Sequence, residues 1–545
     1  MTEPAPPPTT APVKSGGMIR SSMIYSALTL VSRFMGLARD LVITARLGAS
    51  SNIAADAYFT ALAFPNLFRR IFAEGAFAAA FVPDYSRRLA SDGKAAADAF
   101  AADSLATLAA ATVVVTVLCQ LAMPWLMMAY SPGYMSDPAK FKLAVLLTQI
   151  TMPYLVCISI ASLFAGILTA RGRFVIYGLY PTILNLVMLI AVLPQTDPTK
   201  AAFAASVAVL VAGVGQAAIC WWGAHRTGAR VRLKALRFTP EIKALVKRAV
   251  PGVIASSAVQ INLFISAILA SQVAGMRVWL NVAERFYQLP LSLVGVAIGV
   301  ALLPRLSTAF QLEDHEDTQG AMDQAIVFAL ALSLPAAAAL MAMPVYLTDG
   351  LFARGEFTYA DAASSAALLF HYGWGLPAFI LIKILQPAFF ARGDTKTPMR
   401  FSLISVAVNI VLGVALFYTI GFPGIAISTA VASWGTVAQM ALLLWRERIY
   451  RPSAKATGKI LRVAAASAVL GVLLAVAAYF RAVIEAPLAA VGGAKEITVL
   501  AVCLVGGLLY PLLLFAFGGV TPAEVRGAFR RRKGDVAVTV SDPLA

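Results

Sequence analysis

Long apolar segments alternate with short polar ones along nearly the whole chain. The apolar segments are about 20 residues long, which is enough for a helix to cross a ~30 Å hydrocarbon core. A helix also satisfies its own backbone polar groups, as a membrane span must. We count about 14 such segments. The pattern therefore predicts an all-α, polytopic membrane protein with about 14 transmembrane helices.

The composition agrees with this prediction and limits the function classes. Hydrophobic residues make up 60% of the chain and charged residues 13%, which excludes a soluble globular protein. The formal net charge of +17 suggests a nucleic-acid partner, but the basic residues are concentrated in alternate loops. That asymmetry predicts no nucleic acid, anionic membrane lipids as partners, and a multi-pass, N-in, C-in topology.

Neither a metal site nor a catalytic group is indicated. The four cysteines are scattered over different apolar segments, and His225, His315 and His371 stand alone. Ligand spacings of zinc sites and nucleophile–base pairs are both missing from the sequence. We therefore expect no catalytic residues, no metal and no cofactor.

The chain contains an internal repeat. Ala391-Arg392-Gly393 follows Ala170-Arg171-Gly172 by about 221 residues, and a slightly larger offset aligns Asn409 with Asn185. An even number of helices in each unit makes the repeat parallel, which is typical of transporters. The predicted division is a disordered tail (1–17), an N-lobe with helices 1–6 (18–224), a basic cytoplasmic linker (225–248), a C-lobe with helices 7–12 (249–448), an appended helix pair (449–518) and a basic cytoplasmic tail (519–545).

Four arginines lie inside apolar segments, namely Arg33, Arg39, Arg69 and Arg285. A charge at bilayer depth costs at least ~2.5–3.5 kcal/mol, so each is expected to face a partner or a water-filled chamber. Further polar groups near membrane depth are expected to support them: Ser32, Asp40, Asp56, Asn66, Arg70, Glu74, Glu284 and Lys383.

The second apolar segment is the densest in charge. Arg70 and Glu74 are four residues apart on one helical face and can form an ion pair, whereas Arg69 has no such local partner. We therefore predict Arg69 as the ligand-binding residue. A purely structural ion-pair network remains the alternative for Arg70 and Glu74. Pro65 and Gly75 favour a bend in this helix.

The charge balance indicates the ligand class. Bases outnumber acids near membrane depth, and arginine prefers groups that accept two hydrogen bonds, such as phosphate or pyrophosphate. The sequence has no Walker A motif, so we do not expect ATP to drive the protein directly.

Several motifs resemble the MurJ/MviN family of lipid II flippases. They are Ser32-Arg33-x-x-Gly36-x-x-Arg39-Asp40, Asp56-Ala57-Tyr58, the run from Pro65 to Phe77, Ala283-Glu284-Arg285-x-x-Gln288-x-Pro290, Leu351-Phe352-x-x-Gly355-x-Phe357 and Phe390-Ala391-Arg392-x-Asp394-x-Lys396-Thr397-Pro398. The resemblance implies alternating access in the cytoplasmic (inner) membrane of a bacterium, with the undecaprenyl-pyrophosphate-linked peptidoglycan precursor (lipid II) carried to the outer leaflet. It also implies that the four arginines bind substrate and that helices 13 and 14 form a groove for its lipid tail.

One position departs from the family pattern. Members often carry a second carboxylate about one turn after the arginine that corresponds to Arg285, where this chain has Gln288. The role of a charge at that position is in question unless Glu284 replaces it.

Two alternatives remain at this point: a multidrug or cation antiporter, or another polysaccharide-lipid exporter, of the same superfamily. A membrane-embedded enzyme acting on polyprenyl phosphates would need an acidic metal-binding motif, which the sequence lacks. We expect a monomer. Association with the cell-wall synthesis machinery, and coupling to the membrane potential or to an ion, are left open.

Overall fold

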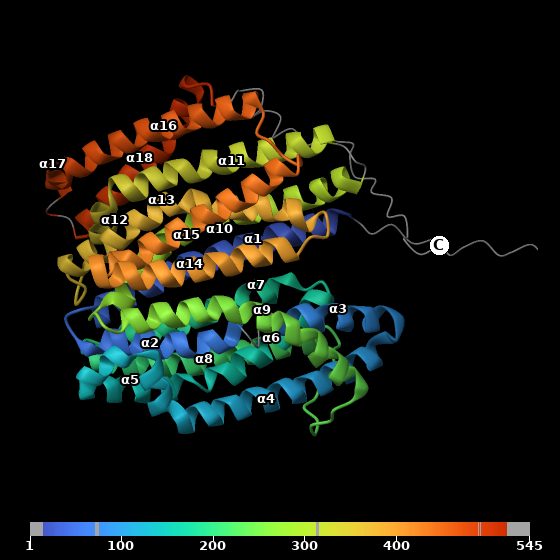
Figure 1. The fold of residues 1–545 in the computed structure, drawn as a ribbon. Coiled ribbons are helices and arrows are strands. Elements are labelled where there is room, and N and C mark those ends of the chain that lie inside the picture. Colours follow the sequence, from blue (N-terminus) through green and yellow to red (C-terminus); the bar gives the residue numbers. More distant parts are fainter. Residues whose placement is uncertain (1–14, 71–75, 312–314, 489, 491, 520–545) are drawn as a thin grey trace, which may run out of the picture. The chain divides into compact units, whose positions relative to one another are not determined.

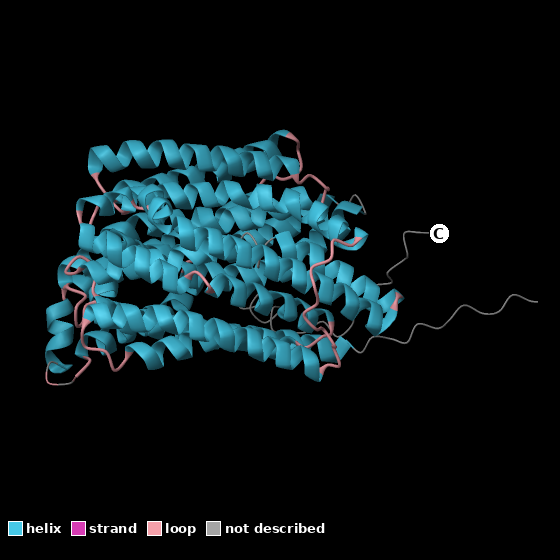
Figure 2. Ribbon diagram, turned by 90° about the horizontal axis from the view of Figure 1, so that it is seen from below, coloured by secondary structure: helices cyan, strands magenta, loops and turns pink. Residues whose placement is uncertain are grey.

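The computed structural model describes residues 15–70, 76–311, 315–488, 490 and 492–519. Throughout these ranges the chain forms helices joined by short turns and loops, and no strand occurs in them (Figure 2). The predicted all-α class is therefore confirmed. Contacts divide the chain into two units, which are described separately.

Unit 1 comprises residues 1–282 together with the short segments 352–365 and 417–422. Its helices, coloured blue to green in Figure 1, are α1 (Ser15–Leu47), α2 (Ile53–Arg69), α3 (Ala76–Ser91), α4 (Gly93–Tyr130), a 3₁₀ turn (Pro132–Ser136), α5 (Pro138–Thr151), α6 (Tyr154–Ala170), α7 (Phe174–Val192), α8 (Pro198–Arg226) and α9 (Pro240–Ala270). Within it α1 packs on α7, α2 packs on α5, and α8 contacts both α6 and α7.

Unit 2 comprises residues 283–351, 366–416 and 423–545. Its helices are α10 (Met276–Gln311), α11 (His315–Ala342), α12 (Pro344–Phe352), α13 (Tyr359–Phe390), α14 (Lys396–Ile420), α15 (Pro423–Arg446), α16 (Ala454–Tyr479), α17 (Arg481–Glu485), a 3₁₀ turn (Ala486–Leu488) and α18 (Ala494–Ala516). The first residues of α10 and α13 and the last of α14 belong to unit 1. Helix α16 packs against both α11 and α18.

Several helices begin where the sequence combines a capping side chain with a proline. Asp137, Asp197 and Thr239 each precede a proline and accept hydrogen bonds from backbone N–H groups of the first turn of α5, α8 and α9. The side chain satisfies N–H groups that have no partner inside the helix, and proline has no N–H to lose at that position. Helix α9 thus starts inside the segment 225–248 that the sequence predicts as a linker.

The predicted second helix is described on both sides of residues 71–75. Helix α2 contains Pro65 and is described to Arg69, and α3 is described from Ala76. Glu74 and Gly75 lie outside the described residues, so the predicted bend at Gly75 and the Arg70–Glu74 pair stay predictions.

Ten helical segments in the described ranges are long and apolar enough to cross a membrane. Large apolar side chains such as Leu121 and Trp125 on α4 and Leu504 on α18 are more than 60% exposed, as lipid-facing residues would be. The predicted count of about 14 is not confirmed, because α1, α2, α9 and α10 are not among the ten. Three of these helices, α1, α2 and α10, carry the candidate arginines.

Candidate functional site

The α1 arginines lie in different environments. Arg39 is buried, and its guanidinium donates to Asp40 Oδ1 from Nε (2.9 Å) and Nη2 (2.7 Å) and to Asn185 Oδ1 from Nη1 (3.0 Å). Arg33, almost two turns earlier in α1, is exposed. Arg39 is therefore held by an ion pair and an amide within unit 1, while Arg33 is accessible.

Asn185 is a site residue that the sequence reasoning did not propose. Its amide donates to the Ser32 carbonyl (3.0 Å) while its oxygen accepts from Arg39, so one α7 side chain holds α1 at two points. The repeat was the only signal in the sequence that marked it. Asn409, its counterpart in unit 2, is also buried, and its side chain accepts a hydrogen bond from Thr429 (3.4 Å).

Arg69 has a neutral partner on its own helix. Its Nε donates to Asn66 Oδ1 at 3.0 Å, and the Asn66 amide in turn donates to the Leu62 carbonyl. The sequence-based expectation concerned opposite charges, and it named Asn66 as a supporting group without pairing it with Arg69. Arg69 is partly buried, whereas the adjacent Arg70 is exposed, as expected for neighbours that point to different faces of a helix.

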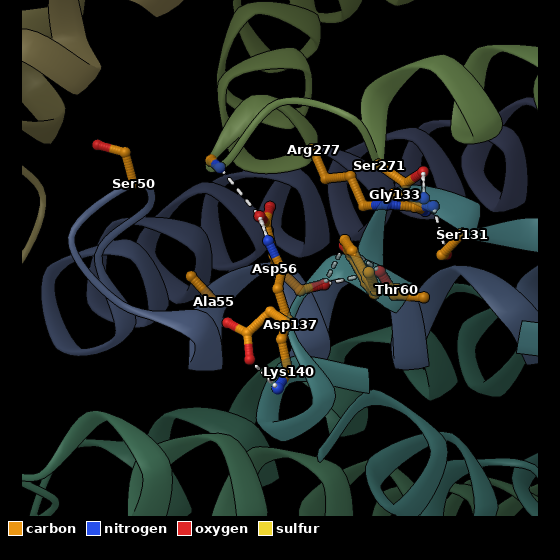
Figure 3. A network of polar contacts seen from close by, with 12 residues as sticks. Ser50, Ala55, Asp56, Thr60, Ser131, Gly133, Asp137, Lys140, Ser271 and Arg277 are labelled. Atoms are coloured by element: carbon orange, nitrogen blue, oxygen red, sulfur yellow. Dashed lines mark hydrogen bonds and ion pairs between the residues drawn. The ribbon is translucent and has the colours of Figure 1, made fainter. Parts of the chain in front are cut away.

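Asp56 lies at the centre of a buried polar cluster, which we call the Asp56 network (Figure 3). Its Oδ2 accepts from Lys140 Nζ on α5 (2.5 Å) and from the Gly275 N–H (2.9 Å). The Tyr134 hydroxyl donates to the Asp56 carbonyl (3.2 Å), and Lys140 Nζ lies 4.4 Å from the centre of the Tyr134 ring. Asp56 is only 1% exposed, so these contacts hold a carboxylate that water does not reach.

Arg277 extends the network from the first turn of α10. It is buried and donates to Ser131 Oγ (2.8 Å) and to the carbonyls of Ala267 (2.9 Å) and Tyr130 (3.3 Å). Its guanidinium carbon also lies 5.6 Å from the centre of the Tyr134 ring. Neither Lys140 nor Arg277 was among the predicted site residues, because each stands next to a loop, where a basic residue usually points into water.

A second set of contacts joins the turn after α1 to residues far along the chain, and we call it the loop contact. Asp361 Oδ1 accepts from the Ser50 hydroxyl (2.5 Å) and from Trp279 Nε1 (3.0 Å). The Glu356 N–H donates to the Ala45 carbonyl (2.9 Å), and Ser51 Oγ donates to the Glu356 carbonyl (3.2 Å).

Glycines allow the backbones to approach this closely. A Cβ at Gly355 would lie 2.2 Å from the Ala45 carbonyl oxygen, and one at Gly275 would lie 2.8 Å from the Ser50 nitrogen. Both glycines also have positive φ, +56° and +81°, which other residues rarely adopt. The loop contact thus requires glycine at positions 275 and 355.

The remaining candidates lie in unit 2. Gln288 donates to Glu284 Oε2 at 3.4 Å, so the amide that replaces a carboxylate in the family pattern contacts the neighbouring acid. The Tyr287 ring packs on Tyr372 and Phe379, with centroids 4.9 and 5.4 Å away. Arg285 is partly buried and Lys383 is exposed.

These groups suit binding of an anion. Within the described ranges, no group of three or more His, Cys, Asp or Glu side chains is placed to hold a metal ion. The arginines present guanidinium groups, which bind phosphate through paired hydrogen bonds.

Comparisons with known proteins agree on one family. The sequence profile described as "Lipid II flippase MurJ" matches residues 43–497. A protein of Rhizobium tropici named "Probable lipid II flippase MurJ" is 38% identical over 434 residues, covering 79% of this chain and 81% of that protein. A protein of the same name from Rhizobium meliloti (strain 1021) is 35% identical and covers 94% of this chain and 96% of its own length.

Solved structures give the same fold. A structure titled "Lipid II flippase MurJ, inward closed conformation" superposes with a TM-score of 0.74 at 22% identity, covering 93% of this chain and all of that one. An inward-facing multidrug resistance transporter of the MATE family, in the MOP superfamily, superposes with a TM-score of 0.60 at 16% identity, over 78% of this chain and 98% of its own.

Proposed function

The chain belongs to the lipid II flippase MurJ family, and we propose that it moves lipid II from the inner to the outer leaflet of the bacterial cytoplasmic membrane. The observation that carries this proposal is the agreement with a flippase relative along almost the whole chain. The runner-up, a drug or cation antiporter, has only a likeness of fold at 16% identity. Translocation requires no bond to be made or broken, so we infer a transporter and not an enzyme.

We propose that Arg33, Arg69 and Arg285 bind the pyrophosphate of the substrate. Arg33 is exposed, and Arg69 is oriented by Asn66. Arg39 has a different role in this proposal. It holds α1 against α7 through Asp40 and Asn185, because its guanidinium already donates three hydrogen bonds to them. Glu284, which precedes Arg285 in the sequence, and Lys383 contribute further charges in this proposal.

Alternating access requires an end of the transporter that closes and reopens. We propose that the loop contact and the Asp56 network together form the closure on the outer side. The basic loops favour a cytoplasmic location for both termini, which assigns the turn after α1 to the outer side. Hydrogen bonds between residues 45–51 and 355–361 would then have to break each time lipid II leaves.

Several further properties are part of the proposal. The protein needs no cofactor and works as a monomer, in reach of the enzymes that polymerise lipid II. Its cycle is biased by the membrane potential or by a coupled ion, since the sequence has no nucleotide site. The potential provides ~2.3 kcal/mol per charge per 100 mV, which is enough to bias a two-state cycle.

Depletion of the protein in its native cell tests the function. We expect lipid II to accumulate on the inner leaflet, and a plasmid copy of the wild type to clear it. A copy with Arg69→Ala should accumulate to the same protein level and fail, and Arg69→Lys should restore little, because a point charge does not reproduce the guanidinium fork. Normal wall synthesis together with new drug sensitivity on depletion would contradict the proposal and support the antiporter.

A further inference from the structure

A second basic site lies in unit 1, away from the α1 and α2 arginines. It is a cavity of about 600 Å³ where three elements meet: the start of α4, the α6–α7 turn and the end of α8. Lys94, Arg171, Arg173 and Arg226 line it, together with Gly93 and Thr227. Its volume is in the range of sites that hold a small molecule or a headgroup.

One of these cations is already neutralised. Arg171 donates to Asp98 Oδ1 (2.6 Å), to the Tyr85 hydroxyl (2.8 Å) and to the Thr227 carbonyl (3.0 Å). The other Asp98 oxygen accepts from the Arg230 N–H (2.8 Å). These bonds hold together α3, α4, the α6–α7 turn and the loop after α8, and we call them the Asp98 cluster. The cluster forms one wall of the cavity, and both carboxylate oxygens of Asp98 already accept hydrogen bonds.

The other three basic side chains of the cavity are positioned to bind a ligand. Lys94, Arg173 and Arg226 are exposed, and no carboxylate of a described residue lies within ion-pair distance of them. The nearby Asp92 carboxylate accepts a hydrogen bond from Ser91 (2.8 Å). The Arg226 guanidinium lies 4.4 Å from the centre of the Trp222 ring, which restricts where it points.

Two observations identify the ligand chemistry. Two arginines and a lysine around one cavity match the three acceptor oxygens of a phosphate group. Trp221 and Trp222, next to the cavity at the end of α8, are 50% and 45% exposed, as tryptophans at the edge of a membrane are. Basic pockets between helices at this level bind the headgroups of anionic lipids.

We propose that this cavity binds a phosphate group, presented by the headgroup of an anionic phospholipid. The site differs from the substrate arginines in its helices, and it does not depend on the proposed flippase function. Because the Asp98 cluster fixes its walls, the cavity is formed before the lipid arrives.

Equilibrium binding of radiolabelled phosphatidylglycerol to the purified full chain, in phosphatidylcholine mixed micelles, tests the proposal. The double variant Arg173→Ala/Arg226→Ala should bind about tenfold more weakly or worse, since two guanidinium groups are lost. The matched control is Arg232→Ala/Lys234→Ala, which removes two exposed charges from the adjacent loop and should change affinity less than about twofold.

The outcomes separate the sources of the phosphate. Loss of lipid binding in the cavity variant alone supports the lipid site. Saturable binding of inorganic phosphate that the cavity variant loses, with lipid binding equal in all three proteins, supports the phosphate site but assigns it to a soluble ligand. Equal weakening of lipid binding in both double variants would show attraction by general charge and would overturn the proposal. Thermal unfolding of each variant shows whether it is folded.

Discussion

The Asp56 network and the Asp98 cluster each bury a carboxylate against a basic side chain, but they connect different parts of the chain. Among the described residues, the Asp98 side chain hydrogen-bonds to Tyr85, Arg171 and Arg230, all of which precede α9. Asp56 contacts Gly275, and the neighbouring loop contact reaches Glu356 and Asp361. The Asp98 cluster can therefore persist through a transport cycle, whereas the region around Asp56 joins segments that the proposed cycle must separate.

The two regions also differ in how much space surrounds their glycines. The loop contact relies on backbone approaches that a single Cβ at Gly355 would block, whereas a Cβ at Gly93, beside the basic cavity, would meet nothing within 4 Å. The loop contact is closed by tight backbone packing, whereas the basic cavity beside the Asp98 cluster is open. The predictions below follow from this difference.

The largest effect is expected at Asp56. Asp56→Ala leaves Lys140 buried without its carboxylate, and breaking a buried pair in this way costs about 3–5 kcal/mol. Adding Lys140→Met removes the orphaned charge and should restore much of the loss. Thermal unfolding of the purified variants measures both. If the two changes simply add, the pair is not coupled as the structure indicates.

The repeated Ala-Arg-Gly motif offers a matched pair of arginines. The side chains of Arg171 and Asp98 are less than 10% exposed, whereas those of Arg392 and Glu447 are 36% and 41% exposed. Arg171→Ala should cost about 3 kcal/mol of stability, and Arg392→Ala about 0–1 kcal/mol, because exposed ion pairs contribute little. Transport by the folded fraction of either variant should stay near the wild-type rate. Equal destabilisation by Arg171→Ala and Arg392→Ala would show that burial does not determine how much each ion pair stabilises the protein.

Gly355→Ala should affect transport and not folding. Its Cβ would strike the Ala45 carbonyl, so the loop contact could not form, and a bias of ~1.4 kcal/mol against closure would already lower the closed population about tenfold. Gly393→Ala is the control, since it has a similar positive φ of +75° but open space around it, and it shares only the left-handed strain of about 1–2 kcal/mol. Flipping of a fluorescent lipid II analogue in liposomes measures both variants. Similar flipping rates for the two variants would mean that left-handed backbone strain, and not loss of the loop contact, causes the effect.

The sequence predicted the helical class and the family, because apolar periodicity and the motif at Pro65–Phe77 are local features. It also named Asp56, Asp40 and Asn66 as polar residues that support the arginines. It did not find Lys140, Arg277 or Asn185, whose partners lie 84, 147 and 146 residues away in sequence. Only folding brings such residues together.

Arg69 shows a different limit. Its partner Asn66 is only three residues away, and the sequence analysis named both residues without pairing them, because it compared opposite charges and not amide acceptors. Neutral side chains orient arginines without neutralising them, so a charge balance does not reveal such pairs.

The central claim is that the loop contact closes the outer end and must open for lipid II to leave. It is tested by Ser51→Cys with Glu356→Cys, after replacement of the four native cysteines Cys119, Cys157, Cys220 and Cys503. Ser51 Oγ lies 3.2 Å from the Glu356 carbonyl, so the two segments are adjacent, and a disulfide formed between these positions would lock the contact. In liposomes, oxidation should lower lipid II flipping to about one-tenth or less, and reduction should restore it. Fully crosslinked protein that flips lipid II at the rate of the reduced form would contradict the account.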